Sequence, residues 1–364
     1  MDPDCRAVLD WIRTAALRTE RVNWARIDGL AATSERHDHA AHTALVREIV
    51  TELDDGHSFV LDPDEAALRQ RGQATTVGMV VSHRDGRVAT VSPAGDAAHK
   101  GIRVGDRIAT VDDKPVTAYG RVGLTAALRR SAWITVVGRT DPLRLEARVI
   151  DTTAVPTVKL LDEHTGGIVL PPMSGATDLQ TAYVRTAHRE LAAAEAHVGH
   201  PIDRWVVDLR LNTGGTMWPM LAALAPLLEE GRLGGFVTRQ GTTGWSLTEG
   251  QIQVDGRTVI DAGGSRSIRR VPPTVAVLTG PLTVSSGEFV AVALAGRPNT
   301  RRLGEPTAGL PTVNDSRPLP DGSLLCLTTG VAADRLDRRH DSELNPDETV
   351  PIEKPSSARQ PTPS

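Results

Sequence analysis

The first part of the chain alternates apolar and charged side chains at helical spacing. The pattern is clearest in AVLDWIRTAALRTERV and HTALVREIVTEL, where glycines are few. It predicts a helical N-terminal region over residues 1–71. The main helical run ends in LDDGHSFVLDP, where Asp54, Asp55 and Gly56 break the helix and place His57 on a turn.

Two further patterns follow. Residues 72–152 carry short β-branched runs between turn residues, which predicts a small β-rich domain. Over residues 153–354 the predicted strands GGIVLPPM, RWVVDLRL and TVAVLTG alternate with the predicted helices ATDLQTAYVRTAHRELAAAEAHV, MLAALAPLLEEG and SSGEFVAVALAG. This alternation predicts a layered α/β domain with active groups on turns at strand ends. Residues 355–364 are rich in Pro and Ser and predict a disordered tail. The expected fold class is α+β multidomain.

Composition narrows the classes of function. The 364 residues carry a net charge of -4 and 3% aromatic residues, which argues against a nucleic-acid partner. The cysteines Cys5 and Cys326 suggest neither a disulfide framework nor a clustered thiolate site, so a reducing compartment is expected. The N-terminal segment does not resemble a signal peptide, and apolar runs are too short for a membrane span. We therefore predict a cytoplasmic protein.

Two turns of the α/β region carry candidate chemistry. After the strand RWVVDLRL, Gly214 and Gly215 permit a backbone whose N–H groups could hold a negative oxygen. After TVAVLTG, Ser285 stands near a helix start, where the amide of Ser286 would be a further oxyanion donor. The alternative is a capping box in which Ser285, Ser286 and Glu288 only cap the start of the helix and have no catalytic role.

A segment of the β-rich region resembles the core of a PDZ domain. VSPAGDAAHKGIRVGDRIATVDDKPV contains the Gly-x-x-x-Gly-Asp turn of that family at residues 101–106. The resemblance implies that a peptide C-terminus would bind a backbone loop and add a strand to the sheet edge. A small β domain without a ligand is the alternative, because Gly-Asp turns are common. The residues expected in the loop are Gly78, Met79 and Val80.

The ordered segments DLRLNTGG, LTGPLTVSSGE and RRLGEPTAG resemble the C-terminal-processing (tail-specific) serine proteases. The resemblance implies a layered catalytic domain of the crotonase/ClpP-like kind, with Ser285 as nucleophile. One branch of that family has a lysine base at the position where this chain has Leu310. The sequence is therefore similar to the other, tricorn-like branch, in which a histidine ahead of the PDZ-like domain is the base. His57 matches that position in LDDGHSF.

The resemblance assigns further roles. A neutral imidazole can accept the serine proton and return it to the leaving amine, and a third polar group should hold the ring. The terminal segment RRHDSELNPDETVP offers Glu343, with Asp341 as the alternative, for this third role. Trp218 lies next to the predicted site and is a candidate substrate contact. The expected oxyanion donors are Gly214, Gly215 and the Ser286 amide.

These assignments predict a serine peptidase acting on unfolded or C-terminal polypeptide segments, with no organic cofactor and no metal. The sequence makes no prediction of oligomeric state. The alternative function is a non-catalytic peptide- or ligand-binding relative of the same fold, because fold does not fix function.

One histidine cluster needs a separate interpretation. His37, His39 and His42 form the pattern H-x-H-x-x-H, which could suggest a metal. On a helix His39 and His42 would share a face, while His37 would fall elsewhere. No Cys or clear third ligand completes a tetrahedral site in the sequence nearby, so a solvated polar face is the favoured interpretation.

Overall fold

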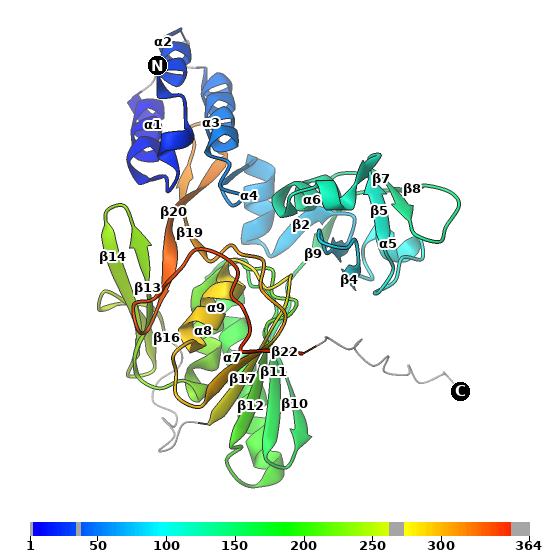
Figure 1. The fold of residues 1–364 in the computed structure, drawn as a ribbon, viewed down its shortest axis with the longest axis vertical. Helices are drawn as coiled ribbons and strands as arrows, with labels where there is room; N and C mark the ends of the chain where they lie inside the picture. Colours follow the sequence, from blue (N-terminus) through cyan, green and yellow to red (C-terminus); the bar gives the residue numbers. More distant parts are fainter. Residues whose placement is uncertain (1–2, 34–37, 262–272, 351–364) are drawn as a thin grey trace.

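A computed structural model describes residues 3–33, 38–261 and 273–350. Figure 1 shows helices at the N-terminal end, a small β unit to one side, and a larger unit built on two sheets below. His37 and the predicted tail at residues 355–364 lie outside the described residues. Within the described ranges, no helix has the length and apolar character needed to cross a membrane.

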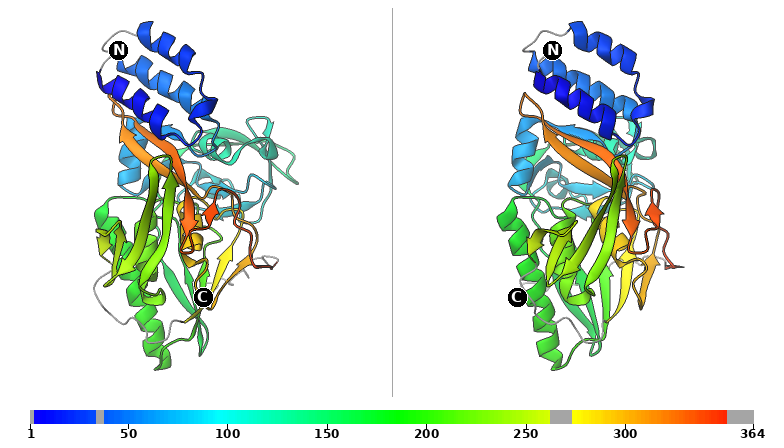
Figure 2. Two further views of the ribbon diagram at one scale, coloured as in Figure 1. Left: turned by 60° about the vertical axis from the view of Figure 1, so that its left-hand side comes forward. Right: turned by 90° about the vertical axis from the view of Figure 1, so that its left-hand side faces the viewer.

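The N-terminal helices pack around a core that includes Ile12, Ile27 and Ile49, each fully buried. Strand β20 (Leu324–Asp334) of the larger unit adds Leu325 and Leu327 to this core, and Figure 2 shows β19 (Thr312–Pro318) and β20 reaching up to the helices. The helices are therefore anchored on the larger unit. Their bounds are α1 (Pro3–Ala15), η1 (Thr19–Arg21), α2 (Trp24–Thr33) and α3 (His39–Leu53).

The small β unit follows helix α4 (Pro63–Gln70) and has its own core of buried aliphatic side chains. Its strands form a four-stranded sheet and two antiparallel two-stranded sheets, β2 with β9 and β3 with β4. The strands are β2 (Gln73–Thr76), β3 (Met79–Val81), β4 (Val88–Val91), β5 (Ile108–Val111), β6 (Lys114–Pro115), β7 (Ala132–Val136), β8 (Leu143–Leu145) and β9 (Arg148–Asp151). The helical segments are α5 (Asp96–His99), η2 (Val116–Ala118) and α6 (Arg121–Leu128).

The larger unit holds the main core between a six-stranded and an eight-stranded sheet. The six-stranded sheet has the order β10-β11-β12-β17-β18-β22 and is parallel except for β10. Its strands are β10 (Thr157–Asp162), β11 (Thr165–Val169), β12 (Arg204–Asp208), β17 (Thr274–Thr279), β18 (Thr300–Gly304) and β22 (Glu348–Thr349). The helices that follow its strands are α7 (Thr177–Val198), α8 (Met217–Leu224), η3 (Ala225–Leu227) and α9 (Ser286–Leu294).

The eight-stranded sheet is antiparallel, with the path β1-β20-β13-β14-β15-β16 and with β19 and β21 also paired to β20. Helix α8 contacts β15 and β16, and α9 contacts β13, β20 and β17, so these helices join the two sheets. The strands are β1 (Phe59–Leu61), β13 (Gly231–Thr238), β14 (Gly241–Thr248), β15 (Gln251–Val254), β16 (Arg257–Asp261), β19 (Thr312–Pro318), β20 (Leu324–Asp334) and β21 (Arg339–His340).

The predicted mixture of helices and strands is confirmed, and β11, α7, β12, α8, β17 and α9 follow one another as predicted, except that the strands β13–β16 stand between α8 and β17. Strands β12 and β17 are parallel neighbours, with Asp208 opposite Leu278. Their carboxyl ends therefore lie at the same edge of the sheet, where the turn with Gly214 and Gly215 meets the turn with Ser285.

Candidate active site

Ser285 is the N-cap of α9 and adopts an unusual backbone conformation, with φ 51° and ψ −117°. A residue with a β-carbon is strained there by about 1–3 kcal/mol. This strained strand-to-helix turn is typical of a nucleophile presented at a sheet edge. Gly214 lies directly against it: a β-carbon at Gly214 would stand 3.0 Å from Ser285 Cβ and 3.4 Å from Oγ.

Glu288 fixes the serine turn from inside the protein. Its side chain is fully buried, and its carboxylate accepts the N–H of Ser285 at 2.8 Å. This is one bond of the capping box that the sequence suggested. The same carboxylate also accepts the Thr307 hydroxyl at 2.6 Å and the N–H groups of Gly309 and Leu310. Glu288 therefore ties the serine turn to the loop after β18 as well as capping α9.

The pKa of Glu288 is raised, chiefly because burial removes water from the carboxylate. The hydrogen bonds from Thr307, Ser285, Gly309 and Leu310 act in the opposite direction. All of these partners donate, so the geometry matches a carboxylate that accepts on both oxygens.

Asn212 is an organising residue whose role the sequence did not reveal. It is fully buried, and its Nδ2 donates to Leu170 O at 3.0 Å. Its Oδ1 accepts the Gly214 N–H at 3.0 Å, and its carbonyl accepts the Val284 N–H at 3.0 Å. Asn212 thus joins both turns. The available signal was its position two residues before Gly214, since Asn side chains often bond their own backbone two residues on.

The predicted oxyanion donors differ in their surroundings. The Gly214 N–H is engaged by Asn212, so this glycine lines the site by close approach. The hydroxyl of Ser286 donates to Gly215 O at 2.6 Å and holds the two turns together. The Ser286 amide belongs to the first turn of α9. The next amide, Gly287 N–H, donates to Val284 O at 2.8 Å.

His57 lies on the turn that the sequence predicted, after α3 ends at the left-handed Asp54. The Asp55 carboxylate accepts the N–H groups of His57 and Ser58 at 2.8 and 2.6 Å. Ring atom Nδ1 of His57 lies 2.6 Å from the Thr312 hydroxyl, and both residues are buried. The imidazole is therefore held in a defined orientation by Thr312.

Leu310 connects the histidine turn to the serine turn. Its N–H donates to Glu288, which in turn holds Ser285. Its side chain faces the turn that carries His57, because a β-carbon built on Gly56 would stand 3.8 Å from Leu310 Cδ2. Leu310 therefore lies near the turn of the predicted base.

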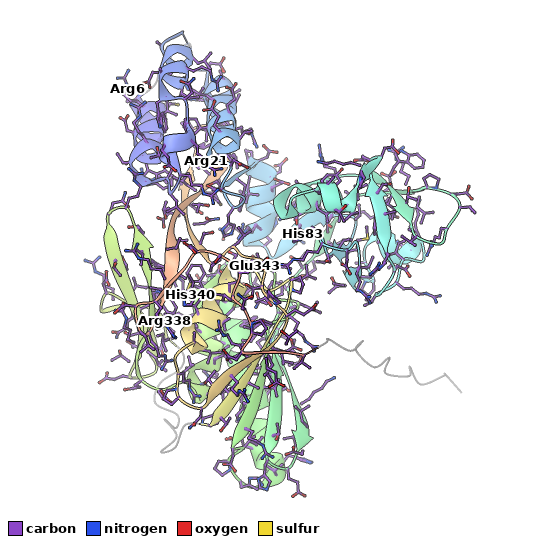
Figure 3. All side chains as sticks on the ribbon, viewed as in Figure 1. Arg6, Arg21, His83, Arg338, His340 and Glu343 are labelled. Atoms are coloured by element: carbon purple, nitrogen blue, oxygen red, sulfur yellow. The ribbon has the colours of Figure 1, made fainter. Side chains whose placement is uncertain are left out.

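Glu343, which was predicted to hold the His57 ring, forms an ion pair with Arg84. Its half-exposed carboxylate accepts Arg84 Nη2 at 2.6 Å, and Arg84 also donates to Thr307 O at 2.9 Å. Figure 3 shows Glu343 where the small β unit approaches the larger one, with His83 on the facing side. Asp341 is exposed. The acidic segment therefore borders the loop that contacts Glu288.

The other predicted contacts are on separate elements. Trp218 is half-buried on α8, with its ring edge-on to Phe236 at 5.8 Å between centroids. In the small β unit, Gly78 precedes β3 and has φ 86°. A β-carbon there would stand 2.4 Å from Gly95 Cα. Met79 is buried and Val80 half-buried on β3.

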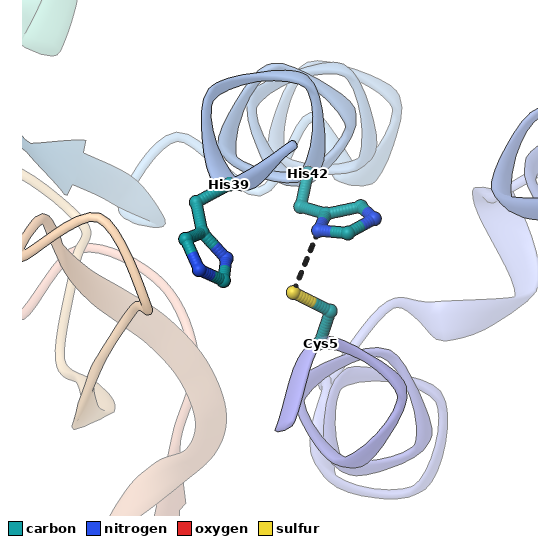
Figure 4. A group of neighbouring side chains, drawn as sticks. All are labelled: Cys5, His39 and His42. Atoms are coloured by element: carbon teal, nitrogen blue, oxygen red, sulfur yellow. Dashed lines mark hydrogen bonds between the residues drawn. The ribbon is translucent and has the colours of Figure 1, made fainter. Parts of the chain in front are cut away.

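The predicted solvated face of the histidine cluster is wrong for His42. This side chain is 4% exposed, and its Nδ1 lies 2.8 Å from Cys5 Sγ. His39 is half-buried beside it (Figure 4). The sequence pattern failed because the third polar group comes from α1, 37 residues away.

Comparisons with known proteins add independent information. The profile of "Peptidase family S41" matches residues 164–350, about half of the chain. A nisin-resistance protein of Lactococcus lactis is 36% identical over 131 residues, 36% of this chain and 40% of its own length. The chloroplastic carboxyl-terminal-processing peptidase 2 of Arabidopsis thaliana is 26% identical over 84% of this chain and 60% of its own length. The chain thus spans only part of these relatives.

Solved structures share the fold. The photosystem II D1 C-terminal processing protease superposes with a TM-score of 0.63 at 19% identity, covering 95% of this chain and 92% of its own. A lipoprotein from Streptococcus agalactiae superposes with a TM-score of 0.62 at 18% identity, covering 95% and 90%. At these identities the likeness concerns the fold alone.

Proposed function

Because the chain belongs to peptidase family S41, we propose that it is a serine peptidase with Ser285 as nucleophile and His57 as general base. Ser285 Oγ bonds to the scissile carbonyl carbon while its proton passes to the His57 imidazole. The C–N bond then breaks as the imidazole protonates the leaving amine. Water next attacks the acyl-enzyme, again with the imidazole as base, and this step releases the carboxylic acid and restores the Ser285 hydroxyl. The observation that carries this proposal is the strained Ser285 turn joined through Glu288 and Leu310 to the His57 turn.

The proposed oxyanion hole consists of the Gly215 and Ser286 amides. The two amides come from the two turns that meet at the site. The hydrogen bond from Ser286 Oγ to Gly215 O holds these turns together and supports the proposal. Donors fixed before the reaction stabilise the tetrahedral intermediate without reorganising. Gly214, predicted as a third donor, contributes the space that a side chain would fill, because its N–H faces Asn212.

We assign the positioning of His57 to Thr312, whose hydroxyl lies 2.6 Å from Nδ1. A hydroxyl there can accept the Nδ1 proton and leave Nε2 as the basic atom. Glu343, the carboxylate predicted for this role, and its alternative Asp341 are assigned to the border of the active-site loop. The bonds from Arg84 to Glu343 and to Thr307 O support that assignment.

For the substrate, we propose unfolded or C-terminal polypeptide segments. The small β unit, residues 72–152, is proposed to be PDZ-like and to present Gly78, Met79 and Val80 to a peptide end, and the unit at residues 153–354 is proposed to be the crotonase/ClpP-like catalytic domain. Trp218 is proposed to border the substrate channel. Two relatives whose names include carboxyl-terminal processing support this substrate class. A reducing compartment such as the cytoplasm is proposed, because Cys5 and Cys326 are buried and are not joined in a disulfide.

A fluorophosphonate probe tests the nucleophile directly. Intact protein should acquire one phosphonyl adduct at Ser285, located by peptide mass spectrometry, together with loss of peptide hydrolysis. A protein that binds peptides but resists the probe would instead support the non-catalytic binding function.

Thr312→Val and Glu343→Gln separate the two candidates for orienting His57. Thr312→Val removes the hydroxyl at Nδ1 with little change in volume, and kcat should fall by about 10- to 100-fold with a displaced pH–rate profile. Glu343→Gln weakens only a half-exposed ion pair with Arg84, so kcat should fall by less than about threefold. The measurement is kcat and KM across pH for each variant. The reverse ranking would return the role to Glu343.

A further inference from the structure

Three potential metal ligands converge between α1 and α3, away from the proposed active site. Cys5 comes from α1, and His39 and His42 come from the first turn of α3. One ligand atom from each residue lies within 4.8 Å of the other two. In Figure 4 the three side chains point into one space between the two helices. We propose that this cluster is a Zn²⁺-binding site.

The donor set fits zinc better than other common cations. Thiolate sulfur and imidazole nitrogen are typical zinc ligands, whereas Mg²⁺ and Ca²⁺ prefer oxygen. Tetrahedral bonds at ordinary zinc distances put sulfur and nitrogen roughly 3.4–3.6 Å apart. Cys5 Sγ and His42 Nδ1 are now 2.8 Å apart, so a modest side-chain rotation would admit the ion.

Burial favours an ion held by these side chains. Cys5 and His42 are each 4% exposed, and they line a small cavity together with the apolar side chains of Val8, Leu9 and Val46. Nδ1 of His39 is also buried and makes no hydrogen bond within the part of the chain that the structure describes. Leaving such an atom unbonded costs free energy that a metal bond would recover. Three protein ligands leave the fourth zinc position to water.

Binding would replace a proton by a metal. The Cys5 thiol loses its proton to solvent as the S–Zn bond forms, and the two imidazoles donate neutral nitrogen lone pairs. The ion would then hold α1 against α3. Since α3 leads into the His57 turn, zinc would stabilise the helical region that carries the proposed base, although this site stands independently of the proposed peptidase chemistry.

Cobalt titration of the full chain, freed of any affinity tag, tests the proposal. Co²⁺ should produce a near-ultraviolet thiolate-to-cobalt charge-transfer band with one equivalent bound, and Zn²⁺ should displace it. Cys5→Ser should abolish the band, and His39→Gln should weaken Zn²⁺ affinity by at least about 100-fold, measured by competition with a chromophoric chelator.

Cys326→Ser is the matched control. Cys326 is also a buried thiol, but it lies on β20, with its Sγ 3.3 Å from the Ser316 hydroxyl, and does not belong to the cluster of Cys5, His39 and His42. This variant should keep the band, and circular dichroism should show that all variants fold. His39→Gln guards against misfolding of the Cys5 variant because His39 is only half-buried. Absence of the band in the natural sequence, or its survival in Cys5→Ser, would overturn the proposal.

Discussion

Ser285→Ala is expected to lower kcat/KM for peptide hydrolysis by at least about 10⁴-fold. Removing the hydroxyl removes the atom that would form the acyl-enzyme, and the remaining site can only bind and polarise the substrate. The fold should be retained, because alanine leaves the N–H bond to Glu288 in place. Peptide hydrolysis, probe labelling and thermal unfolding should be measured on the same preparation.

The backbone strain at Ser285 provides a second test of the same residue. Ser285→Gly should also be inactive. Its free energy of unfolding should exceed that of Ser285→Ala by about 1 kcal/mol, because glycine adopts φ 51° without strain. Ser246→Ala, on β14, serves as the active control. Substantial hydrolysis by Ser285→Ala, measured above the background of the preparation, would remove Ser285 from the mechanism.

The sequence predicted the serine and glycine turns because each follows a short apolar strand directly. Parallel neighbours in a sheet place their following turns at one edge, so Gly214 and Ser285 needed only the strand order to be brought together. The helix stop at Asp54 and Gly56 was equally local, and it positioned His57 on a turn. Local signals were sufficient for these elements.

The partners of those residues could not be predicted in the same way. The contact of His57 with Thr312 joins residues 255 positions apart, and the ion pair of Arg84 with Glu343 joins residues 259 apart. Neither threonine nor arginine stands in a distinctive local pattern. Tertiary packing alone makes these pairs, so the sequence points to the terminal acidic segment for the third polar group, while the structure places the Thr312 hydroxyl next to Nδ1 of His57.

The antiparallel sheet formed by β13–β16, β19 and β20 was also absent from the predicted elements. Strands β13 and β14 are rich in Gly and Thr, as in GRLGGFVT and GTTGWSLT, and lack the clear apolar runs of β12 and β17. Trp245 instead packs over Gly234 of the neighbouring strand, where a β-carbon would lie 2.5 Å from the indole. Glycine here provides space for a buried aromatic ring, a reason that periodicity does not reveal.

His57→Ala is expected to lower kcat/KM by about 10³-fold or more. Without an imidazole, the Ser285 hydroxyl must lose its proton to water, and the leaving amine lacks an acid. The acid limb of the pH–rate profile should disappear. Fluorophosphonate labelling should still occur at Ser285, but more slowly, because the nucleophile remains while its activation is lost.

His197→Ala is the matched control, since His197 lies exposed in the last turn of α7. It should retain full activity. His57→Ala and Thr312→Val combined should be no slower than His57→Ala alone, because the Thr312 hydroxyl acts only through the imidazole it contacts. Additive losses in the double variant would show that Thr312 acts on the substrate or on Ser285 by another route. Unchanged hydrolysis by His57→Ala would require a different base.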